Sequence, residues 1–391
     1  MTKEKVIPQI RFSGFTDTWE QRKLSAIADK VTEKNVGLQY IETFTNSAEF
    51  GIISQRDFFD HDIAKMSSLG GYYIVRSEDF VYNPRISTSA PVGPINRNKL
   101  GRIGVMSPLY TVFRPHDIDT TYLEYFFKSK YWHSFMNFNG DSGARSDRFS
   151  IKDSVFFEMP IPIPHIDEQK KIGAFLDKLD SLITLHQRKY DKLTKVKKAM
   201  LEKMFPENGS PYPEIRFKGF TDAWEQRKLG DIASDMVAGG DIDKDLILAE
   251  GQYPVIANAL TGDGIVGYYD KEYRVNAPAV TVTGRGDVGH AKARLVNFTP
   301  VVRLLSVKSE HDVFFLENVI NTLKIVIEST GVPQLTVPQL AKYEVAFPRQ
   351  LDEEEHIGAF FKQLDHLITL HQRKLEKLKN IKKACLEKMF V

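Results

Sequence analysis

The residue patterns in this chain that come closest to enzyme chemistry are incomplete. Gly284–Arg285–Gly286–Asp287–Val288–Gly289 is as rich in glycine as a nucleotide-binding loop, but it lacks the dinucleotide-binding spacing and no clear helix follows it. Asn83–Pro84–Arg85 begins like the Asn–Pro–Pro–aromatic motif that holds an extruded base in amino-methyltransferases, but the second proline and the aromatic residue are missing. The sequence contains no G-x-x-x-x-G-K-S/T loop, no H-E-x-x-H, no G-x-S-x-G and no cysteine cluster. We therefore expect no catalytic residue, no bound cofactor and no metal site in this chain.

Side chains suited to reading DNA form a second group. Arginine, asparagine and glutamine recognise guanine and adenine at the edges of the bases, and arginine and lysine also bind phosphates. In the region from about 25 to 160 the candidates, most of them in predicted loops, are Asn83, Arg85, Arg97, Arg102, Arg145 and Arg148. In the region from about 230 to 348 they are Arg285, His290, Lys292, Arg294 and Gln334. A single exposed arginine is more often a bystander than a DNA contact, but the clustering favours DNA recognition.

Length and composition limit the kinds of protein this can be. The chain has 391 residues, which suggests two or three domains at about 150 residues each. Its net charge is only +2, so DNA binding would need basic residues concentrated on one face or phosphate contacts shared with a partner. Cys385 is the only cysteine, so no internal disulfide can form and a reducing compartment is expected. With no signal-peptide pattern and no apolar run of about 18 residues, we expect a cytoplasmic protein that does not enter a membrane.

The strongest pattern is an internal repeat of two segments. Residues 8–24 read PQIRFSGFTDTWEQRKL and residues 213–229 read PEIRFKGFTDAWEQRKL, and we name these the A segments. Residues 171–205 read KIGAFLDKLDSLITLHQRKYDKLTKVKKAMLEKMF and residues 356–390 read HIGAFFKQLDHLITLHQRKLEKLKNIKKACLEKMF, and we name these the B segments. The offsets are 205 and 185 residues, so the middle regions, which look unrelated, differ in length by about 20 residues. A constant frame that carries two different middles is typical of a protein whose target-contacting parts vary.

The two middle regions are predicted to be mixed α/β or α+β domains. Strand-like runs occur at residues 72–75, 80–82, 104–106 and 279–282, and turn residues interrupt them. Helical patterns occur near residues 122–135 and 316–328. Together with its A segment, each middle region would form a globular domain of about 150 residues that is rich in strands and loops.

Each B segment has the apolar spacing of a long helix. The spacing is mainly three and four residues, which predicts a coiled coil. The first stripe consists of Ile172, Leu176, Leu179, Ile183, His186, Tyr190, Leu193 and Met200. The second consists of Ile357, Phe361, Leu364, Ile368, His371, Leu375, Leu378 and Cys385. Near the helix ends we expect Val196 and Ile381 to take over the apolar role, a shift that would change the local supercoil.

Charge along the B segments favours an antiparallel pair of helices. Both helices begin with acidic residues, at 167–168 and 352–355, and both end in a lysine-rich half, so each acidic start would meet a basic end. A parallel pair is the alternative. His186 and His371 could hold a metal or act as a switch, but packed or hydrogen-bonded seam histidines are the favoured interpretation. The lysine runs are interpreted as solvated faces, with contacts to a partner or to phosphates as the alternative.

These blocks together resemble the specificity subunits of type I restriction-modification systems, of the staphylococcal kind. The resemblance rests on Gly-Phe-Thr-Asp-x-Trp-Glu-Gln-Arg-Lys-Leu in the A segments, on Ile-Pro-x-x-x-Glu-Gln-x-Lys-Ile-Gly-Ala-Phe at the first B helix, and on the tandem repetition. It covers essentially the whole chain, and Ser-Pro-Leu-Tyr at 107–110 and Thr-Gly-Arg-Gly at 283–286 also resemble phrases of the family's variable domains. The second copy departs at 351–356, where it reads LDEEEH against IDEQKK, so this helix start is expected to contact its neighbours differently.

The resemblance implies a fold and a division of labour. It implies target recognition domains at 1–163 and 207–348 and conserved helices at 164–206 and 349–391, packed as an antiparallel intramolecular coiled coil in a pseudo-twofold repeat. Each domain would read one half of a split target in double-stranded DNA, and the helices would act as a ruler. Two methyltransferase subunits would dock and methylate adenine with S-adenosylmethionine, and two motor-nuclease subunits would use ATP and Mg for translocation and cleavage. None of these cofactors would belong to this chain.

Two other classes of function are alternatives. A stand-alone methyltransferase or nuclease would bind S-adenosylmethionine or cut DNA by itself, and the missing motifs argue against it. A coiled-coil scaffold that joins two proteins without touching DNA would have no salt-dependent affinity for DNA.

Overall fold

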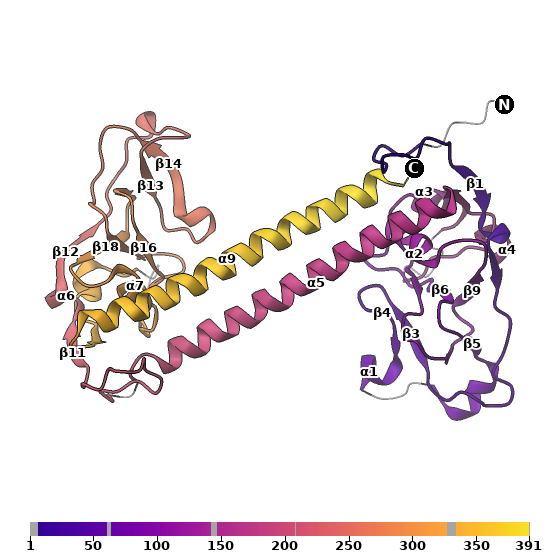
Figure 1. Cartoon of the computed structure of the whole chain (residues 1–391), viewed down its shortest axis with the longest axis horizontal. Coiled ribbons are helices and arrows are strands. Elements are labelled where there is room, and N and C mark those ends of the chain that lie inside the picture. The colour runs from indigo at the N-terminus through magenta and orange to yellow at the C-terminus, as the bar shows by residue number, and fades with distance from the viewer. Residues whose placement is uncertain (1–6, 61–63, 142–146, 208, 327–333, 391) are drawn as a thin grey trace. The chain divides into compact units, whose positions relative to one another are not determined.

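The computed structural model describes residues 7–60, 64–141, 147–207, 209–326 and 334–390, and it divides into two compact units. Unit 1 is Met1–Leu185 with Lys374–Val391, and unit 2 is His186–Arg373. Two long helices, α5 (Ile166–Lys203) and α9 (Leu351–Lys388), contribute residues to both units (Figure 1). The units therefore divide each helix, whereas the predicted segments ended at 163, 206 and 348.

A four-stranded antiparallel sheet organises unit 1. Its strand order is β2 (Ala28–Lys30), β9 (Thr111–Pro115), β6 (Phe80–Tyr82), β7 (Ile95–Arg97). Helix α2 (Thr120–Lys128) packs on this sheet, and the Asp119 carboxylate caps the helix by accepting a hydrogen bond from the Tyr122 N–H at 2.8 Å. Phe80 and Phe113 from the sheet are fully buried with Tyr122 in the main core of the unit, because alternate strand residues point to the same face.

The A segment fastens this domain to the start of helix α5. Strand β1 (Glu20–Lys23) pairs antiparallel with β10 (Pro160–Ile163), which leads directly into the helix. Arg11 donates two hydrogen bonds to the buried Glu168 carboxylate, at 2.7 and 2.8 Å, and Trp19 Nε1 donates a third at 3.2 Å. A buried carboxylate is tolerated here because charge-assisted donors satisfy it.

Unit 2 repeats this architecture strand for strand. Its sheet order is β12 (Ala233–Ala238), β18 (Leu304–Ser309), β15 (Ala279–Thr283), β16 (Ala291–Arg294). Helix α7 (Val313–Asn321) follows β18 as α2 follows β9, and the Asp312 side chain caps it. Strand β11 (Glu225–Lys228) pairs with β19 (Glu344–Phe347), which leads into α9. The two middle regions, which look unrelated in sequence, therefore share one topology.

The two domains differ in the segments inserted between their common strands. Unit 1 adds a hairpin of β3 (Phe44–Ser47) and β4 (Gly51–Ser54), and a pair of β5 (Tyr73–Val75) and β8 (Gly104–Met106). Unit 2 adds a three-stranded sheet of β14 (Ile265–Tyr269), β13 (Tyr253–Ile256) and β17 (Thr299–Pro300). The insertions account for only part of the length difference between the middles, because the segment from α2 to β10 is also longer than the segment from α7 to β19.

Short helices complete the described part of the chain. In unit 1 they are η1 (Leu24–Ala26), α1 (Gln55–Phe59), η2 (Met66–Gly71), α3 (His133–Asn139) and α4 (Asp153–Phe156). In unit 2 they are α6 (Leu229–Ile232), η3 (Lys244–Leu246), η4 (Thr261–Gly264) and α8 (Val337–Leu340).

The predicted strands and helices compare closely with this structure. The strand-like runs at 72–75, 80–82, 104–106 and 279–282 are confirmed as β5, β6, β8 and β15. The helical pattern near 122–135 is two helices, α2 and α3, because the chain turns between them at residues 129–132. The pattern near 316–328 is α7, which begins earlier and ends at Asn321.

Within each unit, the start of one long helix packs with the end of the other. In unit 1, Ile172 and Leu176 of α5 share a core with Cys385 of α9 and with Met389 and Phe390 just beyond it. In unit 2, the starting residues of α9 share a core with the end of α5 and the residues that follow it, through Ile357, Phe361, Leu364, Met204 and Phe205. Each unit therefore brings together helix ends that are far apart in the sequence.

One detail of the predicted stripe is wrong. Ile381 is 36% exposed, whereas Lys382 reaches across to Asp180 and Cys385 is buried. The spacing of three and four thus continues through Leu378, Lys382 and Cys385 without a shift, because the lysine has an acidic partner at that position. Val196, by contrast, does pack against the core of unit 2. In the part of the chain that the structure describes, no helix is both long enough and apolar enough to cross a membrane.

Candidate nucleic-acid interface

In unit 1, the candidates Arg85 and Arg148 meet at the end of the central strand β6. Arg85 forms an isolated antiparallel bridge with Arg148, and the Phe149 N–H donates to the Pro84 carbonyl at 2.7 Å. Asn83 holds the turn: its side-chain amide donates to the Asn46 carbonyl at 2.8 Å, and its Oδ1 accepts from the Arg85 N–H at 3.0 Å. Asn83 is thus a positioning residue that presents the exposed side chain of Arg85.

In unit 2, Arg285 and Gln334 meet at the end of the corresponding strand β15. They form an isolated antiparallel bridge, and the Leu335 N–H donates to the Gly284 carbonyl at 2.9 Å. A side chain at Gly284 would place its Cβ 2.2 Å from the Arg303 carbonyl oxygen, so only glycine allows the strand to end here. Arg285 is exposed, as Arg85 is in unit 1.

These two bridges occupy the same place in the two domains. In both, the residue pair lies just after the sheet strand that comes second along the chain, β6 or β15. There the chain forms a bridge with a later segment that leads back to the long helix. The sequence distance within the pairs is 63 and 49 residues, so no local pattern indicates the pairing. The shared topology brings two sets of candidate side chains to equivalent positions.

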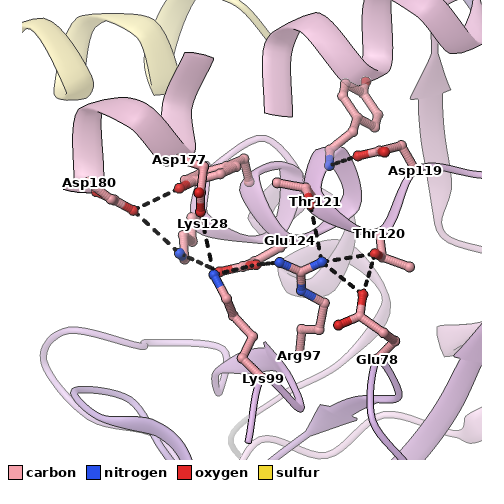
Figure 2. Close-up of polar contacts among 12 residues, drawn as sticks. Glu78, Arg97, Lys99, Asp119, Thr120, Thr121, Glu124, Lys128, Asp177 and Asp180 are labelled. Carbon is pink, nitrogen blue, oxygen red and sulfur yellow. Dashed lines mark hydrogen bonds and ion pairs between the residues drawn. The ribbon is translucent and has the colours of Figure 1, made fainter. Parts of the chain in front are cut away.

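Arg97 is a correction to the predicted set. Figure 2 shows its guanidinium between two carboxylates, with Nη1 3.0 Å from Glu78 and Nη2 2.6 Å from Glu124. Its side chain is 7% exposed and also donates to the Thr120 hydroxyl at 2.8 Å. Arg97 therefore holds helix α2 on the sheet and has no free face for DNA, so we remove it from the candidates.

The ion pairs around Arg97 extend to the long helices. Lys128 lies 2.6 Å from Glu124 and 3.7 Å from Asp180 on α5, and Lys382 of α9 lies 2.5 Å from Asp180 (Figure 2 shows the first two). Burial raises the pKa of Glu124, but Lys128 and the other cations outweigh it, so that its pKa is lower than usual. The network fixes the first domain on both helices.

Among the described residues of unit 1, one further candidate, Arg102, lies apart from the bridge and has its own partner. Arg102 is exposed and forms a bidentate pair with Glu42, at 2.8 to 3.1 Å. Arg145 lies outside the described residues.

The other candidates in unit 2 line a recess on the sheet. His290, Lys292 and Arg294 surround a cavity of about 110 Å³ together with Thr281, Thr283 and Asp263. Burial lowers the pKa of Arg294, whose Nε donates to the Thr281 hydroxyl at 3.0 Å. The two threonines and Asp263 were missed by the sequence analysis. The threonines did carry a signal, because they alternate with the core residues Val280 and Val282 along β15 and so mark a polar face.

Polar residues also meet along the helix seam. The Nδ1 atoms of His186 and His371 lie 2.8 Å apart, so the two rings are hydrogen-bonded to each other, while their place in a coiled-coil seam stays a prediction. Lys197 contacts Asp365 at 2.6 Å in unit 2, as Lys382 contacts Asp180 in unit 1, and each contact maps onto the other by the offset of 185 residues. Among the described residues, no group of three or more His, Cys, Asp and Glu side chains is arranged to hold a metal.

The fold and the paired bridges define a duplicated protein with two α/β domains of one topology and an arginine at the same exposed strand end in each. A family model for the type I restriction modification DNA specificity domain matches residues 17–195 and 221–380. The chain belongs to this family of type I restriction-modification specificity proteins.

Relatives agree over nearly the full length. A putative type I specificity subunit from Mycoplasma pneumoniae is 25% identical over 359 residues, which cover 90% of this chain and 88% of that protein. A putative type I restriction enzyme specificity subunit from Methanocaldococcus jannaschii is 22% identical, with 97% of this chain and 95% of that protein covered. The solved structure of a type I restriction-modification S subunit from M. genitalium superposes with a TM-score of 0.67 at 14% identity, covering 98% of this chain and 99% of that one. This last likeness concerns the fold.

Proposed function

We propose that this chain is the subunit that gives a type I restriction-modification complex its DNA specificity by reading a bipartite, asymmetric target. The observation that carries the proposal is the equivalent placement of Arg85 with Arg148 and of Arg285 with Gln334, at the same strand end in both domains. Different side chains at equivalent positions would read different bases. The two half-sites should therefore differ, and the target should not be a palindrome.

The long helices would set the distance between the half-sites. The proposal is that they pair along their length as an antiparallel coiled coil, which is supported by the contacts of helix starts with helix ends in each unit. Each helix has 38 residues, and a helix of that size is about 57 Å long. This is long enough to separate half-sites by about one turn of DNA or more, near 34–36 Å. Bases between the half-sites would go unread.

The chemistry would belong to partner subunits. Two methyltransferase subunits would dock, one per repeat, and would transfer the methyl group of S-adenosylmethionine to adenine. Two motor-nuclease subunits would supply ATP- and Mg-dependent translocation and cleavage. This chain would catalyse nothing itself and would act in the cytoplasm, where its DNA target is. Its small net charge of +2 supports a role in which phosphate contacts are shared with partners.

Exchange of one domain tests this function. Residues 25–160 would be replaced by the corresponding middle of a different specificity subunit, and methylated adenines would be mapped in the host genome. We expect one half-site to change while the other half-site and the spacer stay the same. An unchanged target, or a change in both half-sites, would contradict the assignment of one half-site to each domain. A matched control exchanges the second middle and should change only the other half-site.

A further inference from the structure

The recess in unit 2 contains two cations, Lys292 and Arg294, for which the described residues provide no direct ion pair. Buried or nearly buried arginines elsewhere in the chain meet carboxylates: Arg11 meets Glu168, Arg216 meets Glu353 and Arg97 meets Glu124. Arg294, by contrast, donates a hydrogen bond only from its Nε, to the Thr281 hydroxyl. In the part of the chain that the structure describes, neither its remaining nitrogens nor the Lys292 ammonium forms an ion pair with a carboxylate, although Asp263 and Glu317 are near enough to raise the pKa of Arg294. Half-buried cations that form no direct ion pair keep hydrogen-bond donors available for an anion.

The contrast with unit 1 sharpens this point. Arg97 ends strand β7 and Arg294 ends strand β16, the corresponding edge strand of the second sheet. The first arginine is enclosed by Glu78 and Glu124, whereas the second lines an open cavity with Lys292. The same strand end thus serves the fold in one domain and is available to a ligand in the other.

We propose that this recess binds one phosphate of the DNA backbone, an inference that rests on the DNA-reading function proposed above. Base edges lie at the floor of a groove about 8.5 Å deep, so the residues that read them must protrude. Phosphates stand out from the outer surface of the duplex, so they can enter a concave site. The cavity of about 110 Å³ with a guanidinium and an ammonium on its wall fits the second geometry.

The recess joins the candidate interface through strand β15. Thr283 lines the cavity, and Arg285 follows two residues later at the exposed strand end. A phosphate held by Lys292 and Arg294 would therefore place the adjoining groove beside Arg285. In this arrangement the recess positions the duplex, while Arg285 and Gln334 read it.

Among the described residues that line the recess, Asp263 is the acidic one, and it opposes an anion. Glu317 also acts on both cations, but burial raises its pKa and so favours its neutral form. This makes an additional prediction with the opposite sign: Asp263→Asn should tighten DNA binding, because it removes the repulsion and keeps the shape of the side chain.

The test uses the full chain in its complex with the methyltransferase subunits and a duplex that contains the mapped target. A series of duplexes replaces one phosphate at a time by a neutral methylphosphonate. We expect one position in the half-site of the second domain to weaken binding of the unchanged complex roughly tenfold, as the loss of a charge-assisted hydrogen bond does. For Arg294→Gln the same position should have no further effect, because the contact is already lost. Arg294→Gln should also weaken binding to target and non-target duplexes by about the same factor. The slope of log affinity against log salt concentration should decrease in magnitude by about one.

The controls separate the possible failures. Lys271→Gln removes an exposed lysine of the same domain and should leave the position-specific effect intact. If Arg294→Gln lowers the thermal midpoint of the chain, Lys292→Gln provides the same comparison. A change in which base pairs are accepted, or equal effects of the methylphosphonates in variant and unchanged complex, would overturn the phosphate site. Absence of sequence-specific binding by the unchanged complex would instead overturn the DNA-reading function.

Discussion

Glu124 and Glu317 occupy the same place in two helices, five residues after the capping aspartates Asp119 and Asp312. Both are buried, but their surroundings differ. Burial raises the pKa of Glu124, and nearby Lys128 and other cations overcome this and bring it below its usual value. Burial also raises the pKa of Glu317, and Lys292 offsets this only in part, so that its pKa stays above its usual value. The two residues should therefore respond to pH with opposite signs.

The pH prediction follows from linkage. Glu124 has a folded pKa below the unfolded one, so its contribution to stability is present above the unfolded pKa and is lost as the pH falls through the folded pKa. Glu317 has a folded pKa above the unfolded one, so its contribution is present below the unfolded pKa and is lost as the pH rises through the folded pKa. At pH 8 we expect Glu124→Gln to lower the thermal midpoint and Glu317→Gln to raise it. The measurement is thermal unfolding followed by circular dichroism at pH 4 and pH 8, and shifts of the same sign at pH 8 would contradict it.

A second residue-scale prediction concerns the ion pair that joins the second A segment to helix α9, which we name the clamp. Arg216 is 13% exposed and Glu353 is 1% exposed, and their atoms are 2.6 Å apart. Removal of one partner from a buried pair leaves an uncompensated charge, so Glu353→Gln should cost about 3 kcal/mol in the free energy of unfolding. The matched control is Glu225→Gln, whose partner Arg349 is 58% exposed and which should cost less than about 1 kcal/mol. Urea unfolding measures both, and equal costs would show that the clamp is not stabilising.

At the scale of elements, the long helices contact each other within each unit through pairs of polar residues. A stripe of apolar residues alone would not fix which residues of the two helices face each other. Asp180 meets Lys382, Lys197 meets Asp365, and His186 meets His371. A shift of one helix by a single turn would separate all three pairs, because each contact joins one particular residue to another. Polar groups at seam positions are a known way to specify register. Within each unit, the two helices are therefore held together through polar contacts as well as packing.

The ruler prediction belongs to this scale. Seven residues would be inserted into each helix at equivalent positions, after Gln187 in α5 and after Gln372 in α9. One added heptad on both helices preserves the apolar spacing and both Asp–Lys pairs, although not the contact of His186 with His371, and lengthens each helix by about 10 Å, or about three base pairs. Methylation mapping should show an unread spacer longer by about three base pairs between unchanged half-sites. If the half-sites themselves change, the helices do not act as a ruler. Insertion into α5 alone is the control and should destabilise the chain.

At the scale of the whole molecule, the two ends of the chain reproduce a connection found in its middle. The Ile215 N–H donates to the Lys203 carbonyl at 2.8 Å, where the first B helix runs into the second A segment. The Ile10 N–H donates to the Lys388 carbonyl at 2.9 Å, where the two segments belong to opposite ends of the chain. The second A segment is therefore hydrogen-bonded to the end of the first B helix, and the first A segment to the end of the second B helix.

This closure predicts that one repeat can assemble with itself. A fragment of residues 1–206 lacks the end of α9, but a second copy would supply Met200, Met204 and Phe205 in place of the equivalent Cys385, Met389 and Phe390. Burial of these apolar side chains should drive a homodimer at micromolar concentration. Light scattering would give the mass of a dimer. A folded monomer would contradict the exchange, and Leu176→Asp should abolish the dimer as a control.

The sequence by itself determined the frame of this protein and left its reading surface largely open. Two copies of the A and B segments, the long helices, four of the strands and the acid-to-base charge order could all be inferred, because these features depend on periodicity and on charge along a continuous segment. The apolar stripes of the helices were predictable for the same reason, except at Lys382, where a charged residue keeps a stripe position because its partner, Asp180, is 202 residues away.

Tertiary structure decided which candidate side chains could act together. Arg97 and Arg294 look alike in the sequence, yet one is neutralised by Glu78 and Glu124 while the other lines an open recess. The common strand order of the two middles was likewise hidden, because many sequences satisfy one pattern of buried and exposed strand faces. The physical reason is that burial and pairing of a charge depend on residues brought close by strand order, and local sequence does not encode that proximity.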